Sequence, residues 1–159
     1  MADPRWLDER QQRAWRGYLA MQAQLHAQLN RRLQAESGLS LADFDVLVAL
    51  SDRHDVQMRV LELAETLQWE KSRLSHQLAR MQRRGLVERH DCADDARGAF
   101  IVLSPAGRHA IEQAAPPHVE AVHSLVFDGL DARQIDTLAE IAGVVLGRMG
   151  ALPEAQPVE

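Results

Sequence analysis

Residues 69–103 restrict the fold of this chain more than any other stretch, because charge, periodicity and turn chemistry agree along it. At about 100° per residue, Leu74, Leu78 and Met81 fall on one narrow face of a helix. The sequence therefore predicts an amphipathic helix that packs on one side and is open to a partner on the other. The outward set is Ser72, Arg73, His76, Arg80 and Arg83.

A hairpin with a polar tip is predicted to follow this helix. Gly85 indicates the end of the helix, because glycine accepts the left-handed backbone that closes a helix. Strand-forming runs begin at Leu86 and at Ala99, and the residues between them, 91–98, are polar and acidic with a final glycine. Helix, glycine, strand, long polar turn and strand together form the outline of a winged helix.

The same helix concentrates positive charge. From Lys71 to Arg84 there are five Lys or Arg residues and no acid, although the formal net charge of the whole chain is −5. Arginine donates two hydrogen bonds to a guanine edge or holds a phosphate, and Ser and Gln bond base edges or backbone oxygens. A positive strip on an acidic protein indicates a polyanion site, and a solvated helix face is the alternative.

Three motifs give this region a family resemblance. They are KSRLSHQLARMQRRGLVER, the tetrad Asp95-Ala96-Arg97-Gly98, and VLSPAG. Together they resemble the recognition helix, the R-G-L-V-x-R strand, the D-x-R-G wing and the L-S/T-x-x-G helix start of the MarR family of bacterial transcription regulators. The chain departs from the commoner pattern of that family by having Trp69-Glu70 where a small capping residue is usual.

The resemblance implies a mainly α fold with a small β-wing. It places a winged helix-turn-helix DNA-binding core at residues 39–104 and dimerisation helices at residues 5–36 and 105–150, all within one MarR-like domain, residues 1–159. The Pro-containing residues 151–159 are expected to form a flexible tail. The expected assembly is an intertwined homodimer on a pseudo-palindromic operator of double-stranded DNA, with half-sites about 10 bp apart.

The resemblance and the side-chain chemistry together assign the DNA contacts. The residues expected to face the major groove are Ser72, Arg73, Ser75, His76, Gln77 and Arg80. The residues expected to contact phosphates are Lys71, Arg83 and Arg84. Arg97 is expected to enter a minor groove while Asp95 holds it by a charge-assisted hydrogen bond, and Gly98 completes the wing motif. An ordinary hairpin salt bridge is the alternative for this pair.

A long amphipathic helix is predicted over residues 5–36, which contain no proline. Its apolar stripe consists of Trp15, Tyr18, Leu25, Leu29 and Leu33. Gly38 should end it, and Ser40 with Asp43 resembles a capping box for a second helix, residues 41–50. Since so long a helix rarely packs on its own domain only, the prediction agrees with a dimer.

Shorter elements are predicted on the way to the recognition helix. Residues 57–59 should be extended and residues 60–67 helical, which makes the latter the first helix of a helix-turn-helix pair. The residues of that helix expected to pack inward are Leu61, Leu63, Ala64 and Leu67. Trp69 is interpreted as a packing residue under the turn.

The last third of the chain predicts two or three more helices. Ser104-Pro105 starts one, since Ser is favoured as the N-cap and Pro in the first turn. The pair Pro116-Pro117 should kink or break it. Asp131 can cap a final helix with an apolar stripe, Ile135, Leu138, Ile141, Ala142, Val145, Leu146 and Met149.

Composition predicts an ordinary globular protein, with 46% hydrophobic and 26% charged residues among 159. No apolar run approaches the roughly 18 residues of a membrane span, and residues 1–13 contain no apolar signal core. We therefore expect a cytoplasmic protein without a membrane partner. The single cysteine, Cys92, agrees with a reducing compartment.

Other functions have weaker sequence support. No motif for catalysis is recognisable, so neither an enzyme nor a cofactor is expected. His90, Cys92 and Asp94 leave a metal- or thiol-sensing regulator open as an alternative, but they lack the paired spacing of a structural zinc site. A dimeric interaction module that has lost DNA affinity is the remaining alternative.

The resemblance also implies a small, aromatic or phenolic effector, which in the family sits between the dimerisation helices and the winged-helix body. Such a ligand changes DNA affinity only if it prefers one spacing of the two recognition helices. The candidate lining residues, each of which core packing explains equally well, are Trp15, Tyr18, Met21, His26, Phe44 and Met81.

Overall fold

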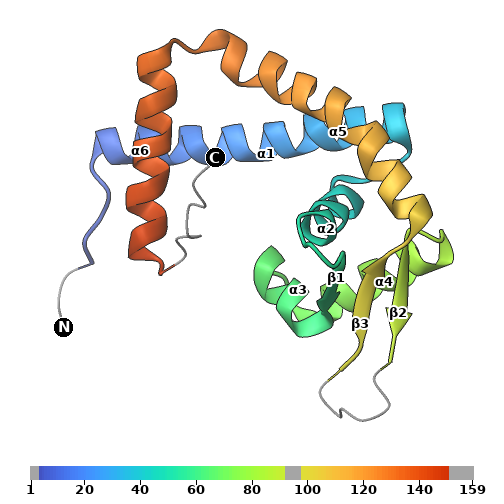
Figure 1. Cartoon of the computed structure of the whole chain (residues 1–159). Coiled ribbons are helices and arrows are strands. Elements are labelled where there is room, and N and C mark those ends of the chain that lie inside the picture. The colour runs from blue at the N-terminus through green and yellow to red at the C-terminus, as the bar shows by residue number, and fades with distance from the viewer. Residues whose placement is uncertain (1–3, 92–97, 151–159) are drawn as a thin grey trace. The chain divides into compact units, whose positions relative to one another are not determined.

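The computed structural model describes residues 4–91 and 98–150, and it is mainly helical with one small sheet. The chain forms two compact units, Met1–Ala121 and Val122–Glu159, with one helix running from the first into the second. In order, the elements are α1 (Glu9–Ser37), α2 (Leu41–Ser51), β1 (Gln57–Arg59), α3 (Val60–Leu67), α4 (Lys71–Arg83), β2 (Val87–His90), β3 (Phe100–Leu103), α5 (Pro105–Leu125), the 3₁₀ turn η1 (Phe127–Gly129) and α6 (Ala132–Arg148) (Figure 1). The expected mainly α fold with a β-wing is confirmed.

Side-chain caps set the ends of the first two helices. α1 begins after Asp8, whose carboxylate accepts from the backbone N–H of Gln11 at 2.8 Å, so the expected start at Arg5 was four residues too early. Gly38, with φ at 69°, ends it. α2 begins after the predicted capping box, in which the N–H of Asp43 donates to Ser40 Oγ at 3.0 Å.

Three antiparallel strands form the sheet in the order β1-β3-β2. Met58 of β1 pairs with Ile101 of β3, and Val87 of β2 pairs with Leu103. β1 covers the extended stretch that the sequence predicted. The tip of the hairpin between β2 and β3 includes residues 92–97, which lie outside the described residues.

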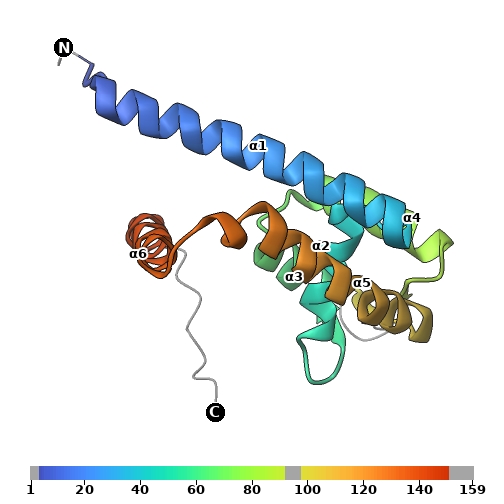
Figure 2. The ribbon, with the colours of Figure 1, turned by 90° about the horizontal axis from the view of Figure 1, so that it is seen from above.

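A shared core joins these elements into what we call the winged-helix module, α2 through β3. Leu47 of α2, Leu74 of α4 and Ile101 of β3 are fully buried in it. The C-terminal half of α1 lies along this module, whereas its N-terminal half runs beyond it (Figure 2). One inward residue was wrongly predicted, because Leu61 on α3 remains 48% exposed.

The start of α5 is clamped against the wing. Ser104 Oγ donates to the carbonyl of Gly85 at 2.6 Å and accepts from the N–H of Gly107 at 2.9 Å, which confirms Ser104 as the cap. A Cβ atom on Gly107 would lie 2.0 Å from the carbonyl oxygen of Leu86. Only glycine therefore permits this close approach of helix to strand.

The proline pair does not break α5. Pro116 and Pro117 lie inside one assigned helix, although neither can donate to the carbonyl four residues earlier. Buried Ala114 and Ala121 lie on either side of the pair, so packing continues across it. The alternative of a helix break is wrong, and the structure has one helix through residues 105–125.

α6 contrasts with the rest of the fold. Asp131 caps it, with its carboxylate accepting from the N–H of Gln134 at 2.8 Å, as predicted. No residue of α6 is buried, and its apolar side chains Leu138 and Val145 remain exposed. Among the helices of residues 4–91 and 98–150, none combines the length and apolar character needed to cross a bilayer.

Candidate nucleic-acid interface

α3 and α4 form the predicted helix-turn-helix. Gln68 in the turn adopts the left-handed conformation, with φ at 53°, and the N–H of Trp69 donates to the carbonyl of Ala64 at 2.9 Å. Leu74, with Leu78 and Met81, buries one face of α4 in the core. The predicted inward face of this helix is confirmed.

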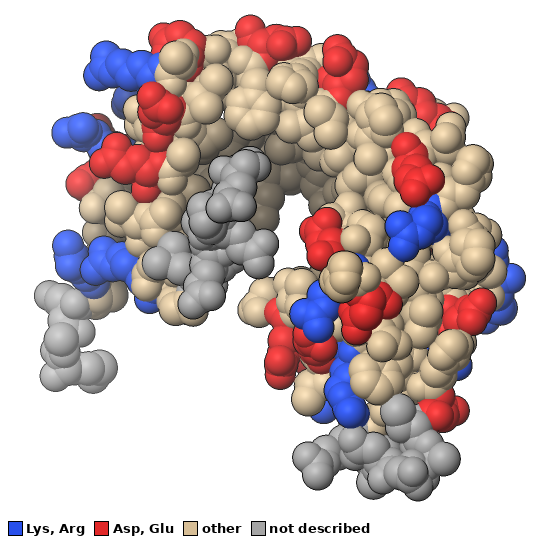
Figure 3. Space-filling model, in the orientation of Figure 1, with Lys and Arg blue, Asp and Glu red and all other residues tan. Residues whose placement is uncertain are grey.

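The opposite side of α4 is exposed and carries cations without an acid, and we call it the cationic face. Its residues are Lys71, Ser72, Arg73, Ser75, His76, Arg80 and Arg83. In the view of Figures 1 and 3, the sheet lies in front of α4, and the visible surface of this module mixes Lys and Arg with Asp and Glu. The cationic face is therefore a local feature of α4 and does not reflect a uniformly basic surface.

Trp69 orders one arginine of the cationic face. Its ring is partly buried against the core, which confirms it as a packing residue under the turn. The guanidinium carbon of Arg73 lies 4.1 Å from the centroid of that ring. A cation–π contact of this kind holds the Arg73 side chain over the start of α4.

The first turn of α4 has no side-chain cap. Glu70 occupies the N-cap position but accepts no capping hydrogen bond, unlike Asp8, Ser40 and Asp131 at the starts of α1, α2 and α6. Glu is a poor cap because its longer side chain reaches the N–H groups of the first turn less well than Asp or Ser. Having Glu70 where the family usually has a small capping residue thus leaves α4 without a side-chain cap.

Gln77 does not face outward, and its predicted contact with the major groove is wrong for this structure. The side chain is 2% exposed, and its Nε2 donates to Asp43 Oδ1 at 2.6 Å. Its Oε1 accepts from Nη2 of Arg80. Gln77 follows Leu74 by three residues and precedes Met81 by four, so helical spacing alone puts it at the edge of the buried face.

Asp43 is the centre of this polar cluster, a role that the sequence analysis missed. Besides Gln77, its carboxylate accepts from the backbone N–H of Ser40 at 2.9 Å and from Nη1 of Arg84 at 2.6 Å. Burial alone would raise the pKa of Asp43, but the hydrogen bonds from Ser40 and Arg84 and the charge of Arg84 outweigh it, so the pKa is lowered. A charged carboxylate therefore lies under α4.

Arg84 was expected to contact a phosphate, but its guanidinium has partners within the protein. Besides Asp43, it donates through Nη2 to the carbonyl of Gly38 at 2.9 Å. It thereby ties the end of α4 to the N-terminus of α2 and to the C-terminal cap of α1. Its phosphate contact stays a prediction.

The wing is described only at its base. Gly98 has φ at 118°, a conformation that favours glycine, whereas Asp95, Arg97 and Cys92 lie outside the described residues. At the end of β2, the Arg89 side chain approaches Asp91 at 3.3 Å. Within the described ranges, no group of three or more His, Cys, Asp or Glu side chains is placed to hold a metal ion.

The six candidate ligand-lining residues differ in burial and in position along the fold. Met81 is fully buried in the core, and its contact with a ligand stays a prediction. Trp15 and Tyr18 stack on each other on α1, with ring centroids 5.7 Å apart, and both are about half exposed. Met21 and His26 are exposed on the same helix. The candidates therefore form separate groups.

One group centres on Phe44, whose ring lies 4.2 Å from that of His118 on α5. His118 Nδ1 is buried without a hydrogen-bond partner among the described residues, and burial lowers the pKa of this histidine against the opposing charge of Asp45. Burial also raises the pKa of Asp45, against the charges of His26 and His118. His118 was not among the ligand residues predicted from the sequence.

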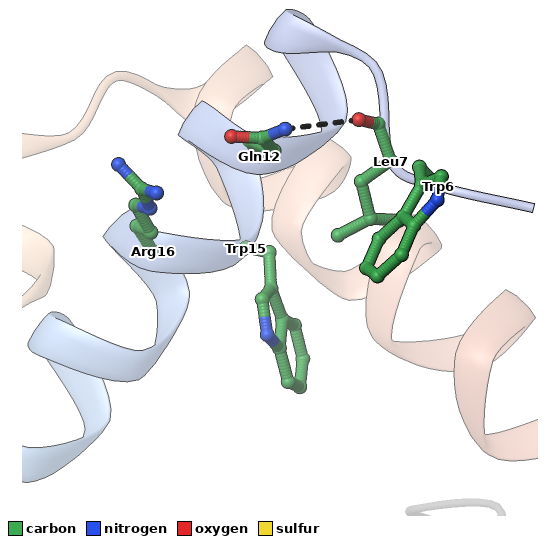
Figure 4. A pocket seen from close by; sticks show the side chains of 5 residues that line it. All are labelled: Trp6, Leu7, Gln12, Trp15 and Arg16. Carbon is green, nitrogen blue, oxygen red and sulfur yellow. Dashed lines mark hydrogen bonds between the residues drawn. The ribbon is translucent and has the colours of Figure 1, made fainter. Parts of the chain in front are cut away.

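A pocket of about 330 Å³ lies instead at the start of α1. Trp6 and Leu7 precede the helix, and Trp15 and Arg16 extend from it (Figure 4). Gln12 folds back so that its Nε2 donates to the carbonyl of Leu7 at 3.0 Å. Of the predicted ligand residues, only Trp15 lines this pocket.

Comparison with known proteins agrees with this geometry. The family model described as MarR family matches residues 37–98. The crystal structure of Sco3205, a MarR family transcriptional regulator from Streptomyces coelicolor in complex with DNA, is 36% identical, with a TM-score of 0.85, and the match covers 98% of this chain and 97% of that one.

Two further relatives support the same assignment. AbsC, a MarR family transcriptional regulator from Streptomyces coelicolor, is 35% identical with a TM-score of 0.85, over 94% of this chain and all of that one (100%). The transcriptional repressor MprA of Escherichia coli strain K12 is 23% identical over 134 residues, which are 84% of this chain and 75% of MprA. The chain belongs to the MarR family of transcription regulators.

Proposed function

We propose that this protein is a double-stranded DNA-binding transcription regulator that acts as a repressor and responds to a small aromatic ligand. The observation that carries the DNA-binding part is the cationic face, an exposed helix surface without an acid in a chain of net charge −5. Sco3205, similar over nearly its whole length, is described in complex with DNA, and MprA is a repressor. Both relatives support the proposal.

The cationic face divides by chemistry into readers and anchors. Arg73 and Arg80, with the shorter Ser72, Ser75 and His76, suit base edges in a major groove. Lys71 and Arg83 suit phosphates, which position the helix without reading sequence. In the wing, Arg97 is proposed to enter the adjacent minor groove with Asp95 as its partner.

A two-fold dimer would present this face twice. The apolar side chains exposed on α6 and on the N-terminal half of α1 are the surface we propose to be covered by a second copy. The operator would then be a pseudo-palindrome with half-sites about 10 bp apart.

The test is binding of the purified protein to a fluorescent duplex from the region upstream of its own gene, measured by anisotropy at fixed salt. We expect Arg73→Ala to weaken operator binding at least about tenfold and to reduce discrimination against a scrambled duplex. Arg83→Ala should weaken both duplexes alike and lower the salt slope by about one per contact. Arg13→Ala, which removes an exposed arginine of α1, is the control and should change neither.

Two outcomes would refute the DNA-binding proposal. One is a wild-type protein that binds the operator and the scrambled duplex equally at every salt concentration. The other is an Arg73→Ala variant and an Arg97→Ala variant that both keep full operator affinity. Either result would favour the alternative of an interaction module that has lost specific DNA binding.

The ligand part of the proposal rests on an aromatic side chain beside one buried polar atom that has no hydrogen-bond partner among the described residues. Phe44 and His118 lie ring against ring, and Nδ1 of His118 is buried. A small acidic phenol would find a stacking surface on Phe44 and a hydrogen-bond partner in this nitrogen. Salicylate is a suitable probe. We expect it to lower operator affinity in the wild type and to lose that effect in Phe44→Leu, whereas an unchanged affinity at saturating salicylate would exclude this ligand class.

A further inference from the structure

We propose that Asp43 and Gln77 set the position of Arg80 before DNA binds, so that a buried carboxylate on α2 controls base discrimination by α4. This inference rests on the proposed DNA-binding function and deepens it. Neither Asp43 nor Gln77 would touch DNA, because their side chains are only 3% and 2% exposed. Both are positioning residues, and Arg80 carries the effect of Gln77 to the surface.

The chain of hydrogen bonds has only one possible polarity. A carboxylate can only accept and a guanidinium can only donate, so the amide of Gln77 must turn its NH₂ to Asp43 and its carbonyl to Arg80. The Gln77 amide thus links the buried carboxylate of Asp43 to the guanidinium of Arg80 at the edge of the cationic face. A side chain without both groups cannot do this.

Asp43 is itself held firmly. Oδ2 accepts from the N–H of Ser40 at 2.9 Å and from Arg84 at 2.6 Å, which leaves Oδ1 for Gln77. The lowered pKa of Asp43 keeps the carboxylate charged at neutral pH. Because Ser40 lies at the N-terminus of α2 and Arg84 at the end of α4, the carboxylate of Asp43 is held from two sides and has little freedom to move.

Tethering matters because a free arginine loses side-chain entropy when it orders at a base edge. Immobilising a long side chain at an interface opposes binding, because rotamer freedom is lost. The hydrogen bond from Arg80 to Gln77, which we call the tether, orders part of the Arg80 side chain before DNA binds. It also restricts the directions in which this side chain can point. Arg83, on the same helix and also exposed, has no side-chain bond of this kind recorded among the described residues and is the natural comparison.

A double-mutant cycle on operator affinity tests the inference. Gln77→Met keeps an unbranched buried side chain but removes both hydrogen-bonding groups. We expect it to weaken specific binding about threefold to tenfold in the wild-type background and to have no further effect in an Arg80→Ala background. In an Arg83→Ala background, the effect of Gln77→Met should remain in full. A merely structural role of Gln77 would weaken binding in all three backgrounds.

A second measurement uses the DNA-free wild-type protein and so does not depend on a folded variant. Nuclear magnetic resonance of the arginine side chains should show slower rotation of the Arg80 guanidinium than of the Arg83 guanidinium. Equal mobility of the two would overturn the inference, as would a Gln77→Met effect that is absent or independent of Arg80. If the wild type shows no specific DNA binding, the proposed function fails, whereas the mobility comparison still decides whether the tether exists.

Discussion

The winged-helix module and α6 both carry apolar side chains at helical spacing, but they bury these side chains very differently. In the module, Leu47, Leu74 and Ile101 have no exposed surface, and their neighbours fill the space between α2, α4 and the sheet. In α6, no residue is buried, and Ile141 is 57% exposed. The module therefore buries its apolar side chains within one chain, whereas the apolar stripe of α6 is exposed and is of the kind that a binding partner covers.

The largest expected effect tests whether the module has a core of its own. Leu47→Ala should lower the free energy of unfolding by about 2–5 kcal/mol, because it removes a fully buried side chain and leaves a cavity. Urea denaturation followed by circular dichroism measures this loss. Leu61→Ala, on a half-exposed residue of α3, should stay within about 0.5 kcal/mol of the wild type. Equal effects at the two sites would mean that burial in the core of the module does not decide how much a leucine contributes to stability.

The second prediction concerns the apolar stripe of α6. Leu138→Asp should weaken the proposed dimer at least about tenfold, since a charge would be buried in the interface. Sedimentation equilibrium across a range of protein concentrations measures the dissociation constant. Gly143→Asp adds the same charge about 140° around α6 from Leu138, where an added side chain meets nothing within 4 Å, and should leave the dimer intact. A Leu138→Asp protein that dimerises like the wild type would show that another surface forms the dimer.

A smaller effect is expected within the module, at the start of α4. If Trp69 holds Arg73 by a cation–π contact, a double-mutant cycle of Trp69→Leu and Arg73→Ala should show a coupling of about 0.5–1 kcal/mol in unfolding free energy. A cycle between Trp69→Leu and Arg83→Ala is the control, and should be additive. Additivity in both cycles would reduce Trp69 to a packing residue only.

The smallest predicted effect has a defined pH dependence. Since burial lowers the pKa of His118, the unfolded chain binds a proton more readily than the folded one. The free energy of unfolding is therefore independent of the titration of His118 above the unfolded histidine pKa of about 6.5. Below that pH it decreases, because the unfolded chain takes up the proton first. His118→Phe keeps a ring against Phe44 and removes the unpaired Nδ1. It should stabilise the protein by roughly a few tenths of a kcal/mol at neutral pH, and by more near about pH 5.

Thermal unfolding of His118→Phe and the wild type at a series of pH values measures this difference. His109→Phe replaces an exposed histidine of the same helix and should follow the wild-type pH profile. A stability difference between His118→Phe and the wild type that does not change with pH would show that His118 titrates alike in the folded and unfolded chain.

Local chemistry made much of the fold predictable from sequence. The capping box of Ser40 and Asp43, the glycine at position 38 and the Ser104-Pro105 start each act within a few residues, and the structure confirms all three. The errors arose where distant residues decide the outcome. Gln77 is polar and was placed outward by residue type, yet Asp43, 34 residues earlier, supplies the partner that makes its burial favourable.

The candidate site was predictable to the same degree. Helical spacing identified the exposed face of α4, because that face depends only on which side the leucines occupy. It did not identify the ties of Arg73 to Trp69 or of Arg80 to Gln77, which depend on side-chain direction. The sequence predicted that the proline pair would kink or break α5, but the helix continues through it, with packed residues on both sides of the pair.

The missing side chain at Gly107 has a mechanical consequence. Where α5 leaves the wing, the backbone of Gly107 lies directly against the carbonyl group of Leu86, and the end of the Leu103 side chain packs beside this contact. A displacement of the first turn of α5 would therefore move the base of the hairpin with it. The contact thus couples the start of α5 to the two strands of the wing, which we propose to lie close to DNA.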